Sequence, residues 1–141
     1  MSAINTGKVL IGGLLAGLVM NVLDFVNGMY IMGEEFRSNA QRLGLDPAQM
    51  ESGAGMATWV TIDFLMGILL VWTYAAMRPR FGPGPSTAVK AAIVPWLAIG
   101  LIMFGLTQGG IMTMSIWVKM SAISLVINMI GSVVGAWAYK E

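Results

Sequence analysis

The fold of this chain depends on the stretch VLIGGLLAGLVMNVLDFVNGMYIM, residues 9–32. A helix of about 20 mostly apolar residues is enough to cross the hydrocarbon core of a bilayer, and this stretch meets that length. Its only charged residue is Asp24. An ionised carboxylate at that depth costs about 3 kcal/mol or more, so Asp24 is expected to face a partner, a cavity or a proton pathway.

Three further hydrophobic runs of similar length follow, at residues 57–77, 88–106 and 116–139. The first of these runs contains a second acid, Asp63. With 57% hydrophobic and 11% charged residues in a chain of 141, the composition lies outside the range of ordinary soluble domains. The sequence therefore predicts an all-α membrane protein with four transmembrane helices, which form one small bundle over residues 1–141. The only sizeable connection is the outer loop 33–56.

The distribution of charge predicts the orientation of the chain. Five basic residues fall at the N-terminus, in the second connection and at the C-terminus, namely Lys8, Arg78, Arg80, Lys90 and Lys140. The opposite side carries Arg37, Arg42 and Lys119 against four acids, Glu34, Glu35, Asp46 and Glu51. Because basic residues favour the cytoplasmic side, both termini are predicted to be cytoplasmic. The first stretch lacks a signal-peptide cleavage site, so it is expected to be a retained span.

Several classes of function are excluded by residue types that the chain lacks. Cysteine and histidine are both absent, which rules out disulfides, thiolate metal sites, histidine-ligated haem and nucleophilic relays that use either residue. No cofactor is expected, and the chain is predicted not to be an enzyme. A net charge of +1 without a basic stripe gives no reason to expect nucleic acid as a partner. The expected partners are the lipid bilayer and other membrane subunits or further copies of the chain.

The chain is rich in methionine, with 13 such residues. We expect them to fill irregular contacts between helices. A methionine-based copper site would be favoured by a Met-x₂₋₃-Met cluster at one membrane face. Met112 and Met114 come closest to this pattern but do not match it, so no metal site is predicted.

Two helix faces carry small and polar residues at helical spacing. The face of the first span comprises Gly13, Gly17, Asn21, Asp24 and Gly28, and that of the fourth comprises Ser121, Ser124, Asn128, Gly131 and Gly135. Steps of three or four residues place each set on one side of its helix. Small residues let backbones approach closely, and Asn and Ser can hydrogen-bond across the contact. These faces are the predicted packing surfaces of the bundle.

The depth of the acids predicts a candidate site. Asp24 lies about four residues beyond the middle of its span and Asp63 about four before the middle of the next, so both fall about 6 Å outside the midplane. If these helices are neighbours, the two carboxyls would share one site and titrate as a coupled unit. Asn21 and Asn128 lie close to the midplane, and Lys119 is long enough to reach down toward the acids. The cluster either fixes helix pairing or exchanges a proton or a cation.

The connection at residues 78–87, RPRFGPGPST, superficially matches a phosphate loop. Each proline removes a backbone N–H donor that such a loop needs, so we interpret it as a rigid cytoplasmic hairpin with arginines near lipid phosphates. A further proline, Pro95, is expected to kink the third span.

Three segments resemble an uncharacterised group of small bacterial membrane proteins: VLIGGLLAGLVMN at 9–21, YAAMRPRFGPGPSTA at 74–88 and VGAWAYKE at 134–141. The hairpin, of the type RPRFGPGPxTA, is the most specific of them. The resemblance implies a four-helix protein of the bacterial inner membrane and carries no activity. The plan of four helices with an acid in the first also resembles that of small multidrug-resistance transporters, whose characteristic residue patterns are absent here.

Two functions follow as expectations. The first is a non-catalytic inner-membrane protein, either a homo-oligomer or an accessory subunit of a larger membrane complex, whose glycine-rich faces serve partners as well as its own core. The alternative is a proton- or cation-coupled transporter of a small molecule that uses Asp24 and Asp63.

Overall fold

The computed structural model describes residues 4–139, which form six helices. They are α1 (Thr6–Tyr30), α2 (Gly33–Arg42), α3 (Pro47–Met50), α4 (Gly53–Phe81), α5 (Pro85–Gln108) and α6 (Met114–Ala138). No strand occurs in this part of the chain. Four of the helices, α1, α4, α5 and α6, are long and apolar enough to cross a membrane. The predicted all-helical, multi-pass architecture is therefore confirmed.

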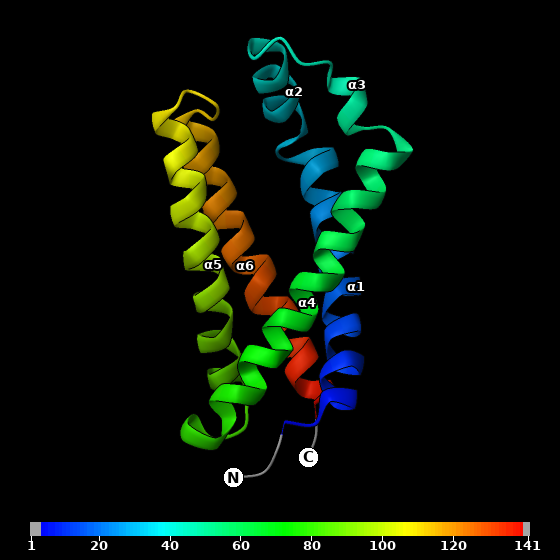
Figure 1. Ribbon diagram of the computed structural model, residues 1–141, viewed down its shortest axis with the longest axis vertical. Helices are drawn as coiled ribbons and strands as arrows, with labels where there is room; N and C mark the ends of the chain where they lie inside the picture. Colours follow the sequence, from blue (N-terminus) through cyan, green and yellow to red (C-terminus); the bar gives the residue numbers. More distant parts are fainter. Residues whose placement is uncertain (1–3, 140–141) are drawn as a thin grey trace.

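The long helices form two pairs that meet at one end of the molecule. In Figure 1, α1 crosses α4 while α5 runs beside α6, and the pairs separate toward the end that carries α2 and α3. Helix α1 packs against both α4 and α6. The ends of the described chain lie together, since the Asn5 amide donates to the Tyr139 hydroxyl over 3.2 Å.

The contact between α1 and α4 brings the two backbones close together at three glycines. A Cβ atom placed on Gly13 would lie 2.5 Å from the Cα of Ile68, and one on Gly17 would lie 2.7 Å from the Cα of Phe64. On the facing helix, a Cβ on Gly67 would lie 2.5 Å from the amide nitrogen of Gly17. Only glycine fits at these three positions, because real Cβ atoms do not approach other atoms so closely. The sequence pattern identified Gly13 and Gly17 but not Gly67.

A second glycine contact joins α1 to α6. A Cβ on Gly12 would lie 2.6 Å from the Gly135 carbonyl oxygen, and one on Gly131 would lie 2.8 Å from Cγ of Met20. The packing predicted for Gly131 and Gly135 thus occurs within the chain itself. Gly28 takes no part in it: this residue is exposed, and a Cβ there would meet nothing within 4 Å. The physical reason is that α1 has left its neighbours by this point, where the two helix pairs separate.

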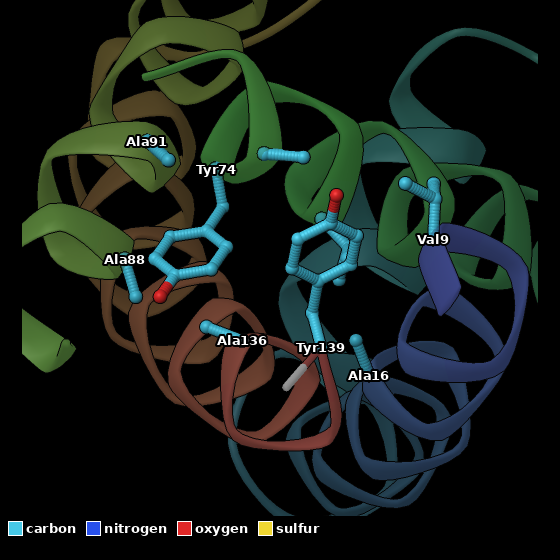
Figure 2. Packing of buried hydrophobic residues seen from close by; sticks show 9 residues of the cluster. Val9, Ala16, Tyr74, Ala88, Ala91, Ala136 and Tyr139 are labelled. Carbon is cyan, nitrogen blue, oxygen red and sulfur yellow. The ribbon is translucent and has the colours of Figure 1, made fainter. Parts of the chain in front are cut away.

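Small residues and two tyrosines fill the closed end of the bundle (Figure 2). The rings of Tyr74 and Tyr139 pack edge to face with centroids 6.1 Å apart. Both rings are almost fully buried, but their hydroxyls are satisfied, since Tyr74 accepts from the Gly84 amide over 3.1 Å and Tyr139 accepts from Asn5. Hydrogen-bonded phenols of this kind can anchor a helix end without leaving a polar atom unpaired.

The hairpin between α4 and α5 is shorter than expected, because α4 continues through Pro79 to Phe81. Pro79 lies in the last turns of the helix, where the loss of one N–H donor interrupts little of the ladder. The chain then reverses at Gly82 and Gly84, whose φ angles of +81° and +126° favour glycine. Thr87 stabilises the turn by donating to the Gly82 carbonyl over 2.8 Å. Pro95 is buried within α5, which continues past it.

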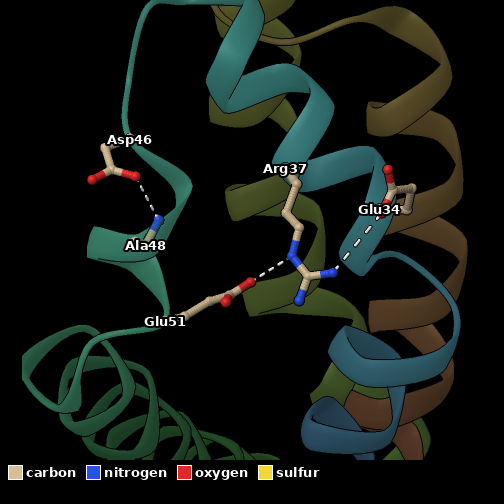
Figure 3. A network of polar contacts seen from close by, with 5 residues as sticks. All are labelled: Glu34, Arg37, Asp46, Ala48 and Glu51. Carbon is tan, nitrogen blue, oxygen red and sulfur yellow. Dashed lines mark hydrogen bonds and ion pairs between the residues drawn. The ribbon is translucent and has the colours of Figure 1, made fainter.

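Helices α2 and α3 lie at the open end (Figure 3). Asp46 caps α3 by accepting from the Ala48 amide over 3.0 Å, as the Asp-Pro pair predicts. Arg37 donates to Glu51 over 2.5 Å and lies 3.9 Å from Glu34. The hydrogen bond and charge of Glu51 raise the pKa of Arg37 above its ordinary value. These groups are exposed, so the pairs contribute little to stability.

Substitution of Gly67 by alanine tests the backbone contact. We expect Gly67→Ala to destabilise the detergent-solubilised protein by about 1–3 kcal/mol, because the new methyl group overpacks against α1. The matched control is Gly105→Ala in α5, where a Cβ meets nothing within 4 Å. That change should be neutral or stabilising by up to about 1 kcal/mol. Thermal unfolding of the two variants measures the difference, and equal midpoints would show that the helices do not meet at Gly67.

Candidate functional site

A cavity of about 130 Å³ lies between the four long helices. Each helix contributes to its wall, which comprises Met20, Asp24, Asp63, Met66, Trp96, Ile99, Gly100, Met103, Met120, Ser121, Ser124 and Asn128. Asp24 comes from α1 and Asp63 from α4. The structure thus brings both intramembrane acids to one site, between helices that the sequence expected to be neighbours.

The glycine contact between α1 and α4 positions the two acids. Asp63 lies one turn before Gly67, and its backbone oxygen would be 3.1 Å from a Cβ on Gly17. Asp24 lies two turns beyond Gly17 on the same face of α1, so both carboxyls emerge beyond the closest approach of the two backbones. Both side chains are half-buried. Within residues 4–139, neither carboxylate accepts a hydrogen bond or forms an ion pair.

Asn21 and Asn128 have different positions, although both were expected near the acids. Asn21 donates to the Gly17 carbonyl over 2.9 Å and, across the helix contact, to the Val60 carbonyl over 3.3 Å. It ties α1 to α4 and is not part of the cavity wall. Asn128 does line the cavity, is only 5% exposed, and has no hydrogen-bond partner for its side chain in the described chain.

The serines of α6 complete one wall of the cavity. Ser124 donates to the Ser121 carbonyl over 3.2 Å, and the same carbonyl accepts from Nε1 of Trp96 over 2.8 Å. The Ser121 hydroxyl is buried without a partner among residues 4–139. Buried polar groups are almost always hydrogen-bonded, so the Ser121 hydroxyl is an exception in this part of the chain.

Lys119 does not reach the acids as the sequence analysis expected. Its ammonium group forms an ion pair with Glu35 of α2, outside the cavity wall. The physical reason is that α2 folds back over the start of α6 and offers a closer carboxylate. Arg42 strengthens this attachment by donating to the Gly110 carbonyl over 2.8 Å, and Asn39 donates to the Ile111 carbonyl over 3.1 Å.

A second, outer cavity of about 250 Å³ lies beneath α2. Its wall comprises Glu34, Glu35, Ser38, Asn39, Arg42, Thr113, Ser115 and Ile116. Ile116 borders this outer cavity, and Met120 borders the inner one. These residues are one helical turn apart on the same face of α6. Lys119 lies between them in the sequence of α6, and its ion-pair partner Glu35 belongs to the outer wall.

Four methionines in the inner wall were missed by the sequence analysis. They are Met20 in α1, Met66 in α4, Met103 in α5 and Met120 in α6, so each long helix contributes one thioether. No local spacing could have revealed them, because they meet only through the packing of four separate helices. Across residues 4–139, no group of three His, Cys, Asp or Glu side chains could hold a metal ion.

Comparisons with known proteins add no assignment: no family model, curated protein or solved structure matches this chain. Function must therefore be argued from the site itself.

Single cysteines can test the cavity, because the chain contains none of its own. Ser124→Cys places a thiol in the cavity wall, whereas Ser132→Cys places one eight residues further along α6, at a fully buried position that packs against Ala88. We expect a small cationic methanethiosulfonate to label Ser124→Cys in membranes and to leave Ser132→Cys unlabelled. Mass spectrometry measures the extent of reaction. Equal reactivity at the two positions would contradict a water-accessible cavity beside the acids.

Proposed function

We propose that the protein is a small transporter that carries a cation, coupled to proton movement, through a site formed by Asp24 and Asp63. One observation supports this most: two carboxylates without ion-pair partners in the described chain line a single cavity walled by all four long helices. A charged side chain within a bilayer is costly unless it is paired or hydrated. A bound cation or proton would supply the positive charge that balances the carboxylates. Its release would make the site free to bind again.

The size of the cavity favours a small ion over a bulky molecule. The volume of the cavity is about 130 Å³. Sites for drug-sized ligands are typically about 300–1,000 Å³. The site therefore fits an ion that keeps few or none of its waters better than a large lipophilic cation.

The outer cavity supports a route of access from the open end of the bundle. We propose that an ion enters beneath α2 and passes the level of the Lys119–Glu35 ion pair to reach the acids. In this proposal the protein lies in the inner membrane of a bacterium. Both chain termini are in the cytoplasm, and the open end of the bundle is on the opposite side of the membrane. The basic residues near the chain ends and in the α4–α5 hairpin support that orientation.

A second candidate is the non-catalytic homo-oligomer or accessory subunit. The glycine faces no longer support it specifically, because their contacts are made within the chain. What favours it is the outer part of α4, residues 53–62, which is exposed almost throughout and carries Trp59 and two threonines. A second copy or another membrane subunit could pack on this segment. Native mass spectrometry from membranes distinguishes a lone chain from either assembly.

Removal of the carboxylates tests the transporter directly. We expect Asp24→Asn and Asp63→Asn each to reduce proton flux in reconstituted liposomes to the level of protein-free vesicles, because an amide neither exchanges a proton nor balances a cation. A pH-sensitive dye inside the vesicles reports the flux after an imposed pH gradient, with sodium, potassium and silver salts tested outside.

The matched control is Glu51→Gln, which removes an exposed acid that lies in neither cavity wall. It should retain most of the flux of the unchanged protein. The proposal would be contradicted by a folded Asp24→Asn, Asp63→Asn double variant with unchanged flux. It would equally fail if the unchanged protein gave no flux with any of these ions.

A further inference from the structure

The inner cavity combines two kinds of ligand atom. Its wall offers four thioether groups, from Met20, Met66, Met103 and Met120, beside the carboxylates of Asp24 and Asp63. We propose that this cavity is a binding site for a soft monovalent metal ion, Cu(I) or Ag(I), held by the methionine thioethers and balanced in charge by an aspartate. That this ion is also transported rests on the proposed function. Its binding in the cavity does not.

The ligand types in the cavity, thioethers and carboxylates, favour Cu(I) or Ag(I) over magnesium, calcium and zinc. Magnesium and calcium require six or more oxygen ligands, and the described residues provide no cluster of three acids. Zinc is usually held by Cys or His, and the chain contains neither. Thioethers are soft ligands that select Cu(I). A monovalent ion needs only one counter-charge, which leaves the second carboxyl to carry a proton in exchange.

The position of the methionines argues against packing as their only role. Met20 is almost fully buried and packs against Gly131, so it has a structural role in the α1–α6 contact. Met66, Met103 and Met120 are half-buried and border open space. Methionine is used in cores because it adapts to fill gaps, yet here three of them leave a gap unfilled. An ion in this gap would be bound by the thioethers of these three side chains.

Two polar groups in the same wall give independent support for a ligand. Asn128 is 95% buried, since only 5% of it is exposed, and its amide has no partner among residues 4–139. The Ser121 hydroxyl is likewise buried without a partner there. Both border the cavity, where they can bind a water molecule or the ion itself.

Silver titration of the full-length protein tests the proposal. Isothermal titration of the detergent-solubilised chain with silver nitrate, in buffer free of chloride, should show one tight site per chain. The test variant is Met66→Leu, Met103→Leu, Met120→Leu, in which volume is conserved and the sulfur is removed. We expect its silver affinity to fall by about 10- to 100-fold or more, as for the loss of groups that support a metal site.

The matched control is Met29→Leu, Met56→Leu, Met114→Leu, which removes three exposed methionines outside the cavity. Its affinity should equal that of the unchanged protein. Equal affinity in the cavity variant would overturn the proposal, as would a complete absence of silver binding by the unchanged protein.

A second measurement needs no variant, in case the triple substitution unfolds. Peroxide converts methionine to its sulfoxide, which mass spectrometry locates along the chain. Bound silver should slow oxidation of Met66, Met103 and Met120 and leave that of Met29, Met56 and Met114 unchanged. Uniform protection, or none, would contradict a site in the cavity.

The outcomes also separate this inference from the proposed function. Flux that depends on Asp24 and Asp63 in a protein that does not bind silver would retain the transporter and remove the soft-metal site. Silver binding that depends on the cavity methionines, without flux of any tested ion, would retain the site and remove the transporter.

Discussion

The rest of the structure depends on the close approach of α1 and α4, at which glycines bring the two backbones into contact. In a bilayer, apolar side chains gain nothing by leaving lipid for another helix, so association requires close packing and interhelical hydrogen bonds. Gly13, Gly17 and Gly67 provide the packing, and Asn21 provides the hydrogen bond to Val60. Helix α1 also packs on α6, and α4 packs on α5 and α6, so both helices of this pair contact the other pair.

The same constraint creates the cavity. The helices are held tightly at the end where Tyr74 and Tyr139 pack, and the pairs separate toward the other end (Figures 1 and 2). Asp24 and Asp63 lie just beyond the tight region, where enough space remains for a few waters or an ion. At the wider end, α2 is attached through the ion pair of Lys119 and the hydrogen bonds of Arg42 and Asn39. In the proposed function, an ion would enter from the wider end and stop at the acids, because the other end is tightly packed.

Sequence reasoning recovered what a single helix determines and missed what the packing of several helices determines. Hydrophobic length and 3.6-residue periodicity predicted the spans and the faces that carry Gly13 and Gly135, because these are properties of one segment. Gly67 has no small neighbour at helical spacing, and the cavity methionines lie on four different helices, so neither left a local pattern. Lys119 and Gly28 were misplaced because their surroundings depend on how α2 folds back and on where the pairs diverge.

The central claim is that Asp24 and Asp63 share one site within the membrane. Carbon-13 NMR of aspartate carboxyls, recorded against pH on protein in lipid nanodiscs, tests it most directly. If the account is right, replacing Asp24 with asparagine changes the titration curve of Asp63, because two carboxyls in one cavity titrate as a coupled pair. A curve for Asp63 that is the same with and without the Asp24 carboxylate would show that the acids are separate, and the proposed site would have to be abandoned.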